Sequence, residues 1–239
     1  MPSAARLFAR WSLAAALLLP MAGHAAPARR NPAPKPAAWA TQASITPVGG
    51  HLLGNRAAAQ KVVEYMSYTC PHCAHFEAES AAPLRAGPIA SGRLSFEVRH
   101  LLRDGVDLTI AMLVNCAPPS QFFAFHSQFL ATQPQWGATW QGLPDTQTKA
   151  WSEGSLGEQL NKVATDLQLY PIAAKLGLST DKAKVCLANE AMFKRLVAQS
   201  EQAQKIGVNG TPSFTINGKL LANAHDWPSL QASLPHAQK

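Results

Sequence analysis

The sequence predicts an α/β fold in which one sheet is completed by both ends of the chain and a block of helices is inserted between them. Strand-like segments occur before residue 106 and again after residue 207. Between these positions the apolar residues recur with helical spacing, and no internal repeat is present. We therefore expect a sheet domain in two parts, residues 45–106 and 207–239, around a helical subdomain at 107–206.

The first part of the sheet domain has the order strand, helix, strand. Lys61–Ser67 is typical of a buried strand and carries one acid, Glu64, inside an apolar run. A helix is predicted over Ala74–Leu84, and the glycines of 87–92 end it. Leu94–Leu102 alternates well enough to predict a second strand.

The inserted block is predicted to hold several helices with connecting segments of different character. The expected helices are Leu108–Ala117, Ser120–Thr132, Ser155–Leu169, Pro171–Leu176 and Thr180–Ile206. Ser179 is a suitable N-cap for the last helix, and a break is expected near Asn189. Residues 133–154 contain several glycines and are expected to be irregular. Three tryptophans in this segment fill the subdomain core, cap its seam with the sheet or line a substrate groove: Trp136, Trp140 and Trp151.

The C-terminal part returns to strands. Pro212–Ile216 and Lys219–Leu221 flank Asn217-Gly218, a dipeptide that favours a two-residue hairpin turn. A terminal helix is predicted over Asp226–Leu234, with Pro228 in its first turn, where a missing N–H is tolerated.

The N-terminus has the pattern of a cleaved export signal at residues 1–25. The pattern consists of early arginines, an apolar run too short to anchor in a bilayer, and small residues before the cleavage point: Arg6, Arg10, Trp11–Leu19, Gly23 and Ala25. A Pro/Ala-rich leader, expected to be disordered, follows at 26–44. Export would deliver the chain to a compartment where disulfides persist.

The distribution of basic residues argues against a nucleic-acid partner, although the net charge is positive. The formal net charge of the whole chain is +7. Loss of Arg6 and Arg10 with the signal would leave 19 basic and 14 acidic residues, a net charge of +5. No dense basic face with interleaved aromatic residues is evident, so we expect no nucleic-acid binding. No pattern indicates more than a monomer.

The residues with the most specific chemistry are Cys70-Pro71-His72-Cys73, which follow a predicted strand and open a helix. The spacing of the two cysteines on a helical turn brings their sulfurs close enough to bond. Free backbone N–H groups at the helix N-terminus stabilise a Cys70 thiolate, the species that attacks and leaves in thiol–disulfide exchange. Pro71 holds the turn, and a protonated His72 would add positive charge. We expect Cys70 to be an exposed nucleophile and Cys73 a more buried resolving thiol.

At this point the sequence resembles a known family. Val62–Cys73 is similar to the active-site segment of DsbA-type thiol–disulfide oxidoreductases, and the Pro-His dipeptide is typical of their oxidising members. Gly207–Phe214 resembles the family's cis-proline loop. The resemblance implies a thioredoxin fold with an inserted α-helical subdomain and a periplasmic location. It further implies that the Thr211–Pro212 bond is cis and that Thr211 offers main-chain groups to an extended substrate. Glu64 matches a buried acid that tunes the proton on Cys73.

The other two cysteines, Cys116 and Cys186, fall on separate predicted helices. A static disulfide between them, a second redox pair and two free thiols all remain open. A zinc site built on Cys70, Cys73 and the nearby His72 and His75 is disfavoured, because no second pair of closely spaced cysteines exists. A purely structural Cys70–Cys73 bond is disfavoured because so short a loop stabilises little.

We therefore expect an enzyme that introduces disulfides into newly exported proteins by exchange at Cys70 and Cys73. Reduced exported proteins are the expected substrates. The resemblance implies that a membrane quinone-linked oxidase of DsbB type regenerates the disulfide, and no bound metal or organic cofactor is needed. A disulfide isomerase or reductase of the same fold is the alternative among enzymes. A peptide-binding chaperone with incidental cysteines is the alternative from another class.

Overall fold

A computed structural model describes residues 36–234 of the chain. The predicted export signal, residues 1–25, and the first part of the leader lie outside the described residues. The remainder of the leader differs from the prediction, since residues 36–44 contain the short helix α1 (Pro36–Trp39) and most of strand β1 (Ala43–Ile45). β1 is held by antiparallel pairing with β2 (His51–Gly54), a contact that Pro/Ala composition does not reveal.

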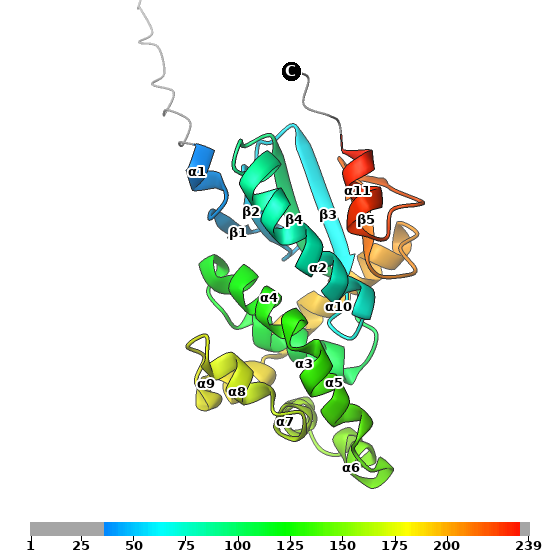
Figure 1. The fold of residues 1–239 in the computed structure, drawn as a ribbon. Coiled ribbons are helices and arrows are strands. Elements are labelled where there is room, and N and C mark those ends of the chain that lie inside the picture. Colours follow the sequence, from blue (N-terminus) through cyan, green and yellow to red (C-terminus); the bar gives the residue numbers. More distant parts are fainter. Residues whose placement is uncertain (1–35, 235–239) are drawn as a thin grey trace, which may run out of the picture. The chain divides into compact units, whose positions relative to one another are not determined.

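The sheet contains six described strands in the order β1-β2-β4-β3-β5-β6. The long strand β3 (Gln60–Met66) runs parallel to β4 (Leu94–His100) and antiparallel to β5 (Ser213–Ile216). β6 (Lys219–Leu220) pairs with β5. Figure 1 shows early strands and the late strand β5 in one sheet, which confirms that both ends of the chain complete it. β1 and β2 were not predicted, because three or four residues are too few to show alternation.

The hairpin between β5 and β6 turns at Asn217-Gly218, as predicted. Both residues have positive φ, 50° and 82°, which is the conformation that a tight two-residue turn requires. The Asn217 side chain also accepts a hydrogen bond from the Lys61 backbone N–H at 2.9 Å and thereby ties the turn to the start of β3.

The two faces of β3 meet different helices. Val62 and Met66 belong to the main core, together with Phe76 of α2 (Pro71–Leu84). Val63 and Tyr65 lie in a second cluster with Ala203 of α10 (Glu190–Lys205). Since successive strand residues point to opposite faces, Glu64 shares the α2 side with Val62 and Met66. Figure 1 shows α2 in front of β3, beside α11 (Trp227–Ser233).

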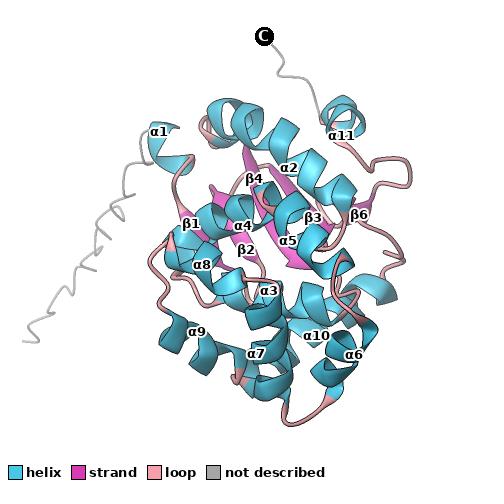
Figure 2. Cartoon of the chain, turned by 60° about the horizontal axis from the view of Figure 1, so that its bottom comes forward, coloured by secondary structure: helices cyan, strands magenta, loops and turns pink. Residues whose placement is uncertain are grey.

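The inserted block is helical, as predicted. Its helices are α3 (Gly105–Asn115), α4 (Phe122–Ala131), α5 (Gln133–Gln141), α6 (Asp145–Lys149), α7 (Leu156–Asp166), α8 (Leu169–Ala174), α9 (Thr180–Leu187) and α10. Figure 2 shows α3, α7 and α9 near one another, and these helices contact pairwise. The break near Asn189 is confirmed: its side chain caps α10 by accepting from the Met192 N–H at 3.0 Å. Ser179 caps α9 as expected.

The prediction that residues 133–154 are irregular is wrong. They form α5, α6 and the 3-10 turn η3 (Ala150–Ser152). Burial of Trp136 stabilises α5, and its indole N–H donates to the Phe129 carbonyl at 3.1 Å. Packing of this side chain therefore overrides the low helix propensity of Gly137.

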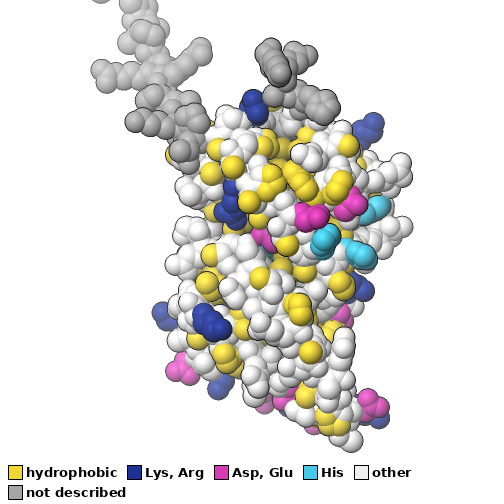
Figure 3. Space-filling view, viewed as in Figure 1, with side chains coloured by type: hydrophobic (Ala, Val, Ile, Leu, Met, Phe, Trp, Pro, Cys, Tyr) yellow, Lys and Arg dark blue, Asp and Glu magenta, His cyan; other side chains and the backbone are white. Residues whose placement is uncertain are grey.

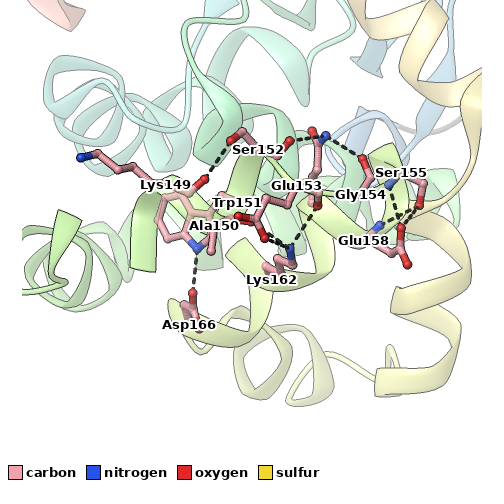
Figure 4. Close-up of polar contacts among 11 residues, drawn as sticks. Lys149, Ala150, Trp151, Ser152, Glu153, Gly154, Ser155, Glu158, Lys162 and Asp166 are labelled. Carbon is pink, nitrogen blue, oxygen red and sulfur yellow. Dashed lines mark hydrogen bonds and ion pairs between the residues drawn. The ribbon is translucent and has the colours of Figure 1, made fainter. Parts of the chain in front are cut away.

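The third tryptophan, Trp151, belongs to a polar junction between η3 and α7 (Figure 4). Its indole N–H donates to Asp166 at 2.7 Å, and Lys162 donates to the Ala150 carbonyl at 2.8 Å. Ser155 and Glu158 form a capping box at the start of α7. Trp151 therefore fixes the subdomain's own architecture, whereas Trp136 and Trp140 both line a pocket beside Pro71.

The described part of the chain shows neither a dense basic patch on the face drawn in Figure 3 nor a single membrane-spanning helix. Lys and Arg side chains are scattered singly over the face shown in Figure 3. Among residues 36–234 no single helix has the length and apolar character needed to cross a membrane, and only the sharply bent pair Gly105–Asn115 and Pro119–Ala131 meets that test together.

Cys116 and Cys186 form a disulfide, which excludes the two free thiols among the states left open by the sequence. The bond joins the C-terminal end of α3 to α9, with Cα atoms 6.0 Å apart and a sequence separation of 70 residues. It closes a long loop within the helical block and so restricts the unfolded chain.

Removal of this disulfide should lower stability without altering the fold. For the Cys116→Ala/Cys186→Ala double variant we expect a loss of about 2–4 kcal/mol in the free energy of unfolding, because the unfolded chain regains loop entropy. Urea unfolding followed by circular dichroism measures the change. The comparison is best made in a Cys70→Ser/Cys73→Ser background, where no other disulfide can form. An unchanged midpoint would show that the loop constraint is unimportant.

Candidate active site at the start of α2

Cys70 lies where β3 ends and α2 begins. It is the N-cap residue of α2, and Pro71 occupies the first helical position. α2 therefore starts three residues earlier than predicted, with both cysteines in its first turn. Cys70 exposes 3% of its surface and Cys73 none. The order of burial is as expected, but Cys70 is far less exposed than predicted, because the Thr211 loop covers its sulfur.

The two thiols have opposite proton affinities. The pKa of Cys70 falls from its ordinary value of 9.0 to about 5, chiefly because the Cys73 thiol hydrogen-bonds to its sulfur. Burial opposes this shift, and the Thr211 side chain and the backbone N–H groups of Cys73 and His72 reinforce it. Burial, followed by the hydrogen bond to Cys70 and the charge of Glu64, raises the pKa of Cys73 well above its usual value. The pair therefore holds a thiolate at Cys70 and a thiol at Cys73.

His72 has an exposed imidazole, and the positive charge that its protonation would add stays a prediction. Its backbone N–H lowers the pKa of Cys70. This is the effect of a helix N-terminus, where the first N–H groups lack partners within the helix.

The Thr211–Pro212 loop meets the cysteine pair from 141 residues downstream. The Thr211–Pro212 peptide bond is cis, as the resemblance implied. The Cys70 sulfur lies 3.1 Å from the Thr211 carbonyl oxygen, to which a protonated thiol donates. A groove of about 450 Å³ opens here. It is lined by Cys70, Pro71, His72, Leu101, Arg103, Asn209, Gly210 and Thr211.

Glu64 lies beneath the cysteines, as predicted, with 1% of its surface exposed. Burial, reinforced by the charges of Glu77 and Cys70, raises the pKa of its carboxyl well above the usual value. Among the described residues its Oε2 atom has no hydrogen-bond partner. A carboxyl next to a buried thiol can supply a proton to Cys73 when it is protonated and accept one when it is ionised.

Sequence reasoning missed a buried polar chain behind Glu64. Burial opposes ionisation of Glu77, but His126 and Ser127 lower its pKa overall. The Nε2 atom of His126 lies 3.7 Å from Glu77, and its Nδ1 lies 3.1 Å from the Tyr68 hydroxyl. Glu77 could have been found from the sequence, since it lies four residues after Cys73 and therefore on the same face of the helix. His126 comes from α4, and nothing local in the sequence links it to α2.

A second missed residue, Asp107, supports the turn that leads to Cys70. Its carboxylate accepts hydrogen bonds from the backbone N–H groups of Tyr68, at 2.7 Å, and Arg103, at 3.0 Å. Burial raises its pKa to about 7, against the effect of these bonds. In the sequence, Asp107 could have been found from its position three residues after Asp104, which is the N-cap of α3.

Two further histidines, His75 and His100, lie in different surroundings. His75 is exposed and pairs with Glu79 at 3.2 Å, whereas buried His100 is 3.0 Å from the Asn115 side-chain amide. Within residues 36–234 no group of three or more His, Cys, Asp or Glu side chains could hold a metal ion.

Comparison with known proteins agrees with this geometry. A family model described as thioredoxin matches residues 46–235. A crystal structure described as protein-disulfide isomerase from Novosphingobium aromaticivorans is 42% identical, with a TM-score of 0.74 over 77% of this chain and 95% of that one. DsbA1 of Wolbachia pipientis is 24% identical, with a TM-score of 0.58 over 74% and 77% of the two chains, and shows the same fold.

The chain belongs to the thioredoxin family and has the fold of its DsbA-type members, with an inserted helical subdomain. A Rickettsia typhi protein carrying a protein-disulfide oxidoreductase name is 28% identical over 174 residues, or 72% of this chain and 56% of the relative. The chain thus spans little more than half the length of that relative.

The reduced protein should react as a thiolate in mild acid. We expect the rate of iodoacetamide alkylation at Cys70 to follow an ionisation near pH 5, because the folded protein favours the thiolate. The Cys73→Ala variant should titrate at higher pH, since the main stabilising hydrogen bond is lost. A folded pKa below the unfolded one also means that the reduced protein loses stability as the pH falls from 9 toward 5. A wild-type midpoint near 9 would contradict the assignment.

Glu64→Gln should become more stable than the wild type as the pH rises. The pKa of this carboxyl is higher in the folded protein than its unfolded value of about 4.5. The wild-type protein therefore loses stability as the pH rises, because the carboxyl ionises freely only in the unfolded chain. We expect the difference in free energy of unfolding between reduced variant and reduced wild type to grow from pH 5 to pH 9. Exposed Glu201 on α10 gives the control, Glu201→Gln, whose difference should stay flat. A flat Glu64→Gln difference would place an ionised carboxylate at this position.

Proposed function

We propose that the chain is an exported thiol–disulfide oxidoreductase that oxidises paired cysteines in newly exported proteins. The observation that carries the proposal is the opposed protonation of the pair, with Cys70 favoured as thiolate and Cys73 as thiol. A low pKa at Cys70 stabilises the reduced form, and the corresponding disulfide is therefore a stronger oxidant. The export-signal pattern of residues 1–25 supports a periplasmic location.

In the first step a substrate thiolate attacks the Cys70 sulfur of the Cys70–Cys73 disulfide. A mixed disulfide forms at Cys70, and the old bond breaks with its electron pair on Cys73. The raised pKa of Cys73 favours uptake of a proton, for which the protonated carboxyl of Glu64 is the proposed donor. In this role Glu64 stays at the cysteine pair and does not touch the substrate.

In the second step the other substrate thiolate attacks the substrate sulfur of the mixed disulfide. Cys70 leaves as a thiolate, and the low pKa makes it a good leaving group. The substrate loses two electrons and gains a disulfide, while the enzyme's pair is reduced. The proposal assigns reoxidation to a membrane quinone-linked oxidase of DsbB type, and the two sulfurs are the only redox groups that it requires.

The groove beside Cys70 fits an extended polypeptide as substrate. Thr211 lines this groove and lies against the Cys70 sulfur, so its main-chain groups can pair with a strand-like segment that carries the attacking cysteine. The groove is open at the surface and is lined by three segments: the start of α2, the loop after β4 and the loop before β5. These features support a protein substrate rather than a small molecule enclosed by the fold.

A second candidate, disulfide isomerase, is favoured by one observation. The structural relative with 42% identity is described as a protein-disulfide isomerase. Isomerisation would use the same Cys70 thiolate but would require the pair to be kept reduced, so the two functions differ in the resting redox state rather than in the site.

Equilibration of the Cys70–Cys73 pair with glutathione tests whether the protein is poised as an oxidase or as an isomerase. We expect a reduction potential nearer to the about −120 mV of strongly oxidising dithiols than to the about −270 mV of thioredoxin, because the Cys70 thiolate stabilises the reduced form. A potential near the thioredoxin value would exclude the oxidase.

Activity assays provide the companion measurement. The oxidised protein should form disulfides in a reduced substrate, and Cys70→Ser should abolish this. Reshuffling of a scrambled, disulfide-rich substrate by the reduced protein without added oxidant would favour the isomerase. Full function in Cys70→Ser would point to a chaperone with incidental cysteines.

A further inference from the structure

The inserted helices reach the catalytic turn through Gln133, the first residue of α5. Its side chain is half-buried, and its amide nitrogen donates to the Tyr68 carbonyl at 2.6 Å and to the Cys70 carbonyl at 3.0 Å. Two carbonyl acceptors fix which end of the amide faces the turn, since only the NH₂ group can donate to both.

Two other side chains of the block hold the same turn. Asp107 accepts from the Tyr68 N–H at 2.7 Å, and Asp104 accepts from the Thr69 hydroxyl at 2.8 Å. Both come from the N-terminal end of α3. Of these three side chains, Gln133 alone bonds to the peptide group of Cys70 itself.

The Cys70 carbonyl is shared among several donors. The backbone N–H groups of Cys73 and Ala74 lie 3.2 and 3.4 Å from it, longer than the 3.0 Å bond from Gln133. The Cys73 N–H also donates to the Cys70 sulfur. When Gln133 satisfies the carbonyl, the Cys73 N–H remains available to the sulfur. Without Gln133 the Cys73 N–H would hydrogen-bond more strongly to the Cys70 carbonyl and more weakly to the thiolate.

We propose that Gln133 is a positioning residue that sets the reactivity of Cys70 by holding the Tyr68 and Cys70 carbonyls toward α5. The inference rests on the proposed function, because it concerns how readily Cys70 exists as the thiolate that exchange requires. It gives the inserted subdomain a direct part in determining the redox behaviour of the pair. Gln133 itself touches neither sulfur nor substrate.

Two substitutions at Gln133 test the inference. Gln133→Met keeps a similar length but removes both donors, and Gln133→Glu adds an anion near the turn. In the Met variant we expect the pKa of Cys70 to rise by roughly half a unit to one unit, or about three- to tenfold less thiolate below the pKa. The Glu variant should shift further. Thiolate absorbance against pH measures this, and the equilibrium with glutathione should move toward the disulfide by a similar factor.

The matched control is Gln135→Met, a change of the same kind at an exposed position on α5. It should leave both the pKa and the glutathione equilibrium unchanged. A Gln133→Met protein that unfolds cooperatively, retains the Cys116–Cys186 bond and shows the wild-type pKa would overturn the inference. An equal shift in Gln135→Met would overturn it as well, because the effect would then belong to α5 as a whole.

A second variant covers failure of the Met protein to fold. Gln133→Asn keeps the donor but is one methylene shorter and cannot reach both carbonyls, so an intermediate pKa rise supports the inference and an unchanged value overturns it. An ordinary Cys70 pKa in the wild type would overturn the proposed function. A low wild-type pKa that no Gln133 variant alters would overturn only the role of Gln133.

Discussion

The antiparallel pairing of β5 with β3 is the contact on which the site depends. Its register sets Ser213 opposite Tyr65 and Phe214 opposite Glu64, so the residues just before β5 reach the end of β3 where α2 begins. Thr211 thereby lies against the Cys70 sulfur. A slip of one residue would turn every β5 side chain to the other face and remove Phe214 from its contact with Phe76 under α2.

The second constraint is the exclusion of water beneath the pair. Cys73 and Glu64 are both buried, and the charge of Glu64 adds to the cost of ionising Cys73, so a proton is retained there while Cys70 ionises at the helix start. The asymmetry arises from position rather than from residue type, since two chemically identical thiols receive opposite pKa shifts. Glu77, His126 and Tyr68 extend this polar region into the seam between α2 and α4.

The helical insertion holds the turn that leads to Cys70. α3 supplies Asp104 and Asp107 to the turn before Cys70, and α5 supplies Gln133. The disulfide between Cys116 and Cys186 lies inside this block and ties α3 to α9. One chain thus contains two cysteine pairs with different surroundings: the first is set at a helix N-terminus with a groove beside it, and the second joins two helices of the insertion.

Local patterns determined much of the molecule. The strand before Cys70, the helix after Cys73, the break at Asn189 and the hairpin at Asn217-Gly218 depend on neighbouring residues and were predicted from them. The short strands β1 and β2 and the helix α5 were not, because strand pairing and the burial of Trp136 decide them. The same holds at the site. Sequence alone identified the two cysteines and Glu64, whereas the parts of Asp107, His126 and Gln133 emerged only when folding brought distant helices to one turn, since hydrogen bonds between distant segments leave no periodic trace in the sequence.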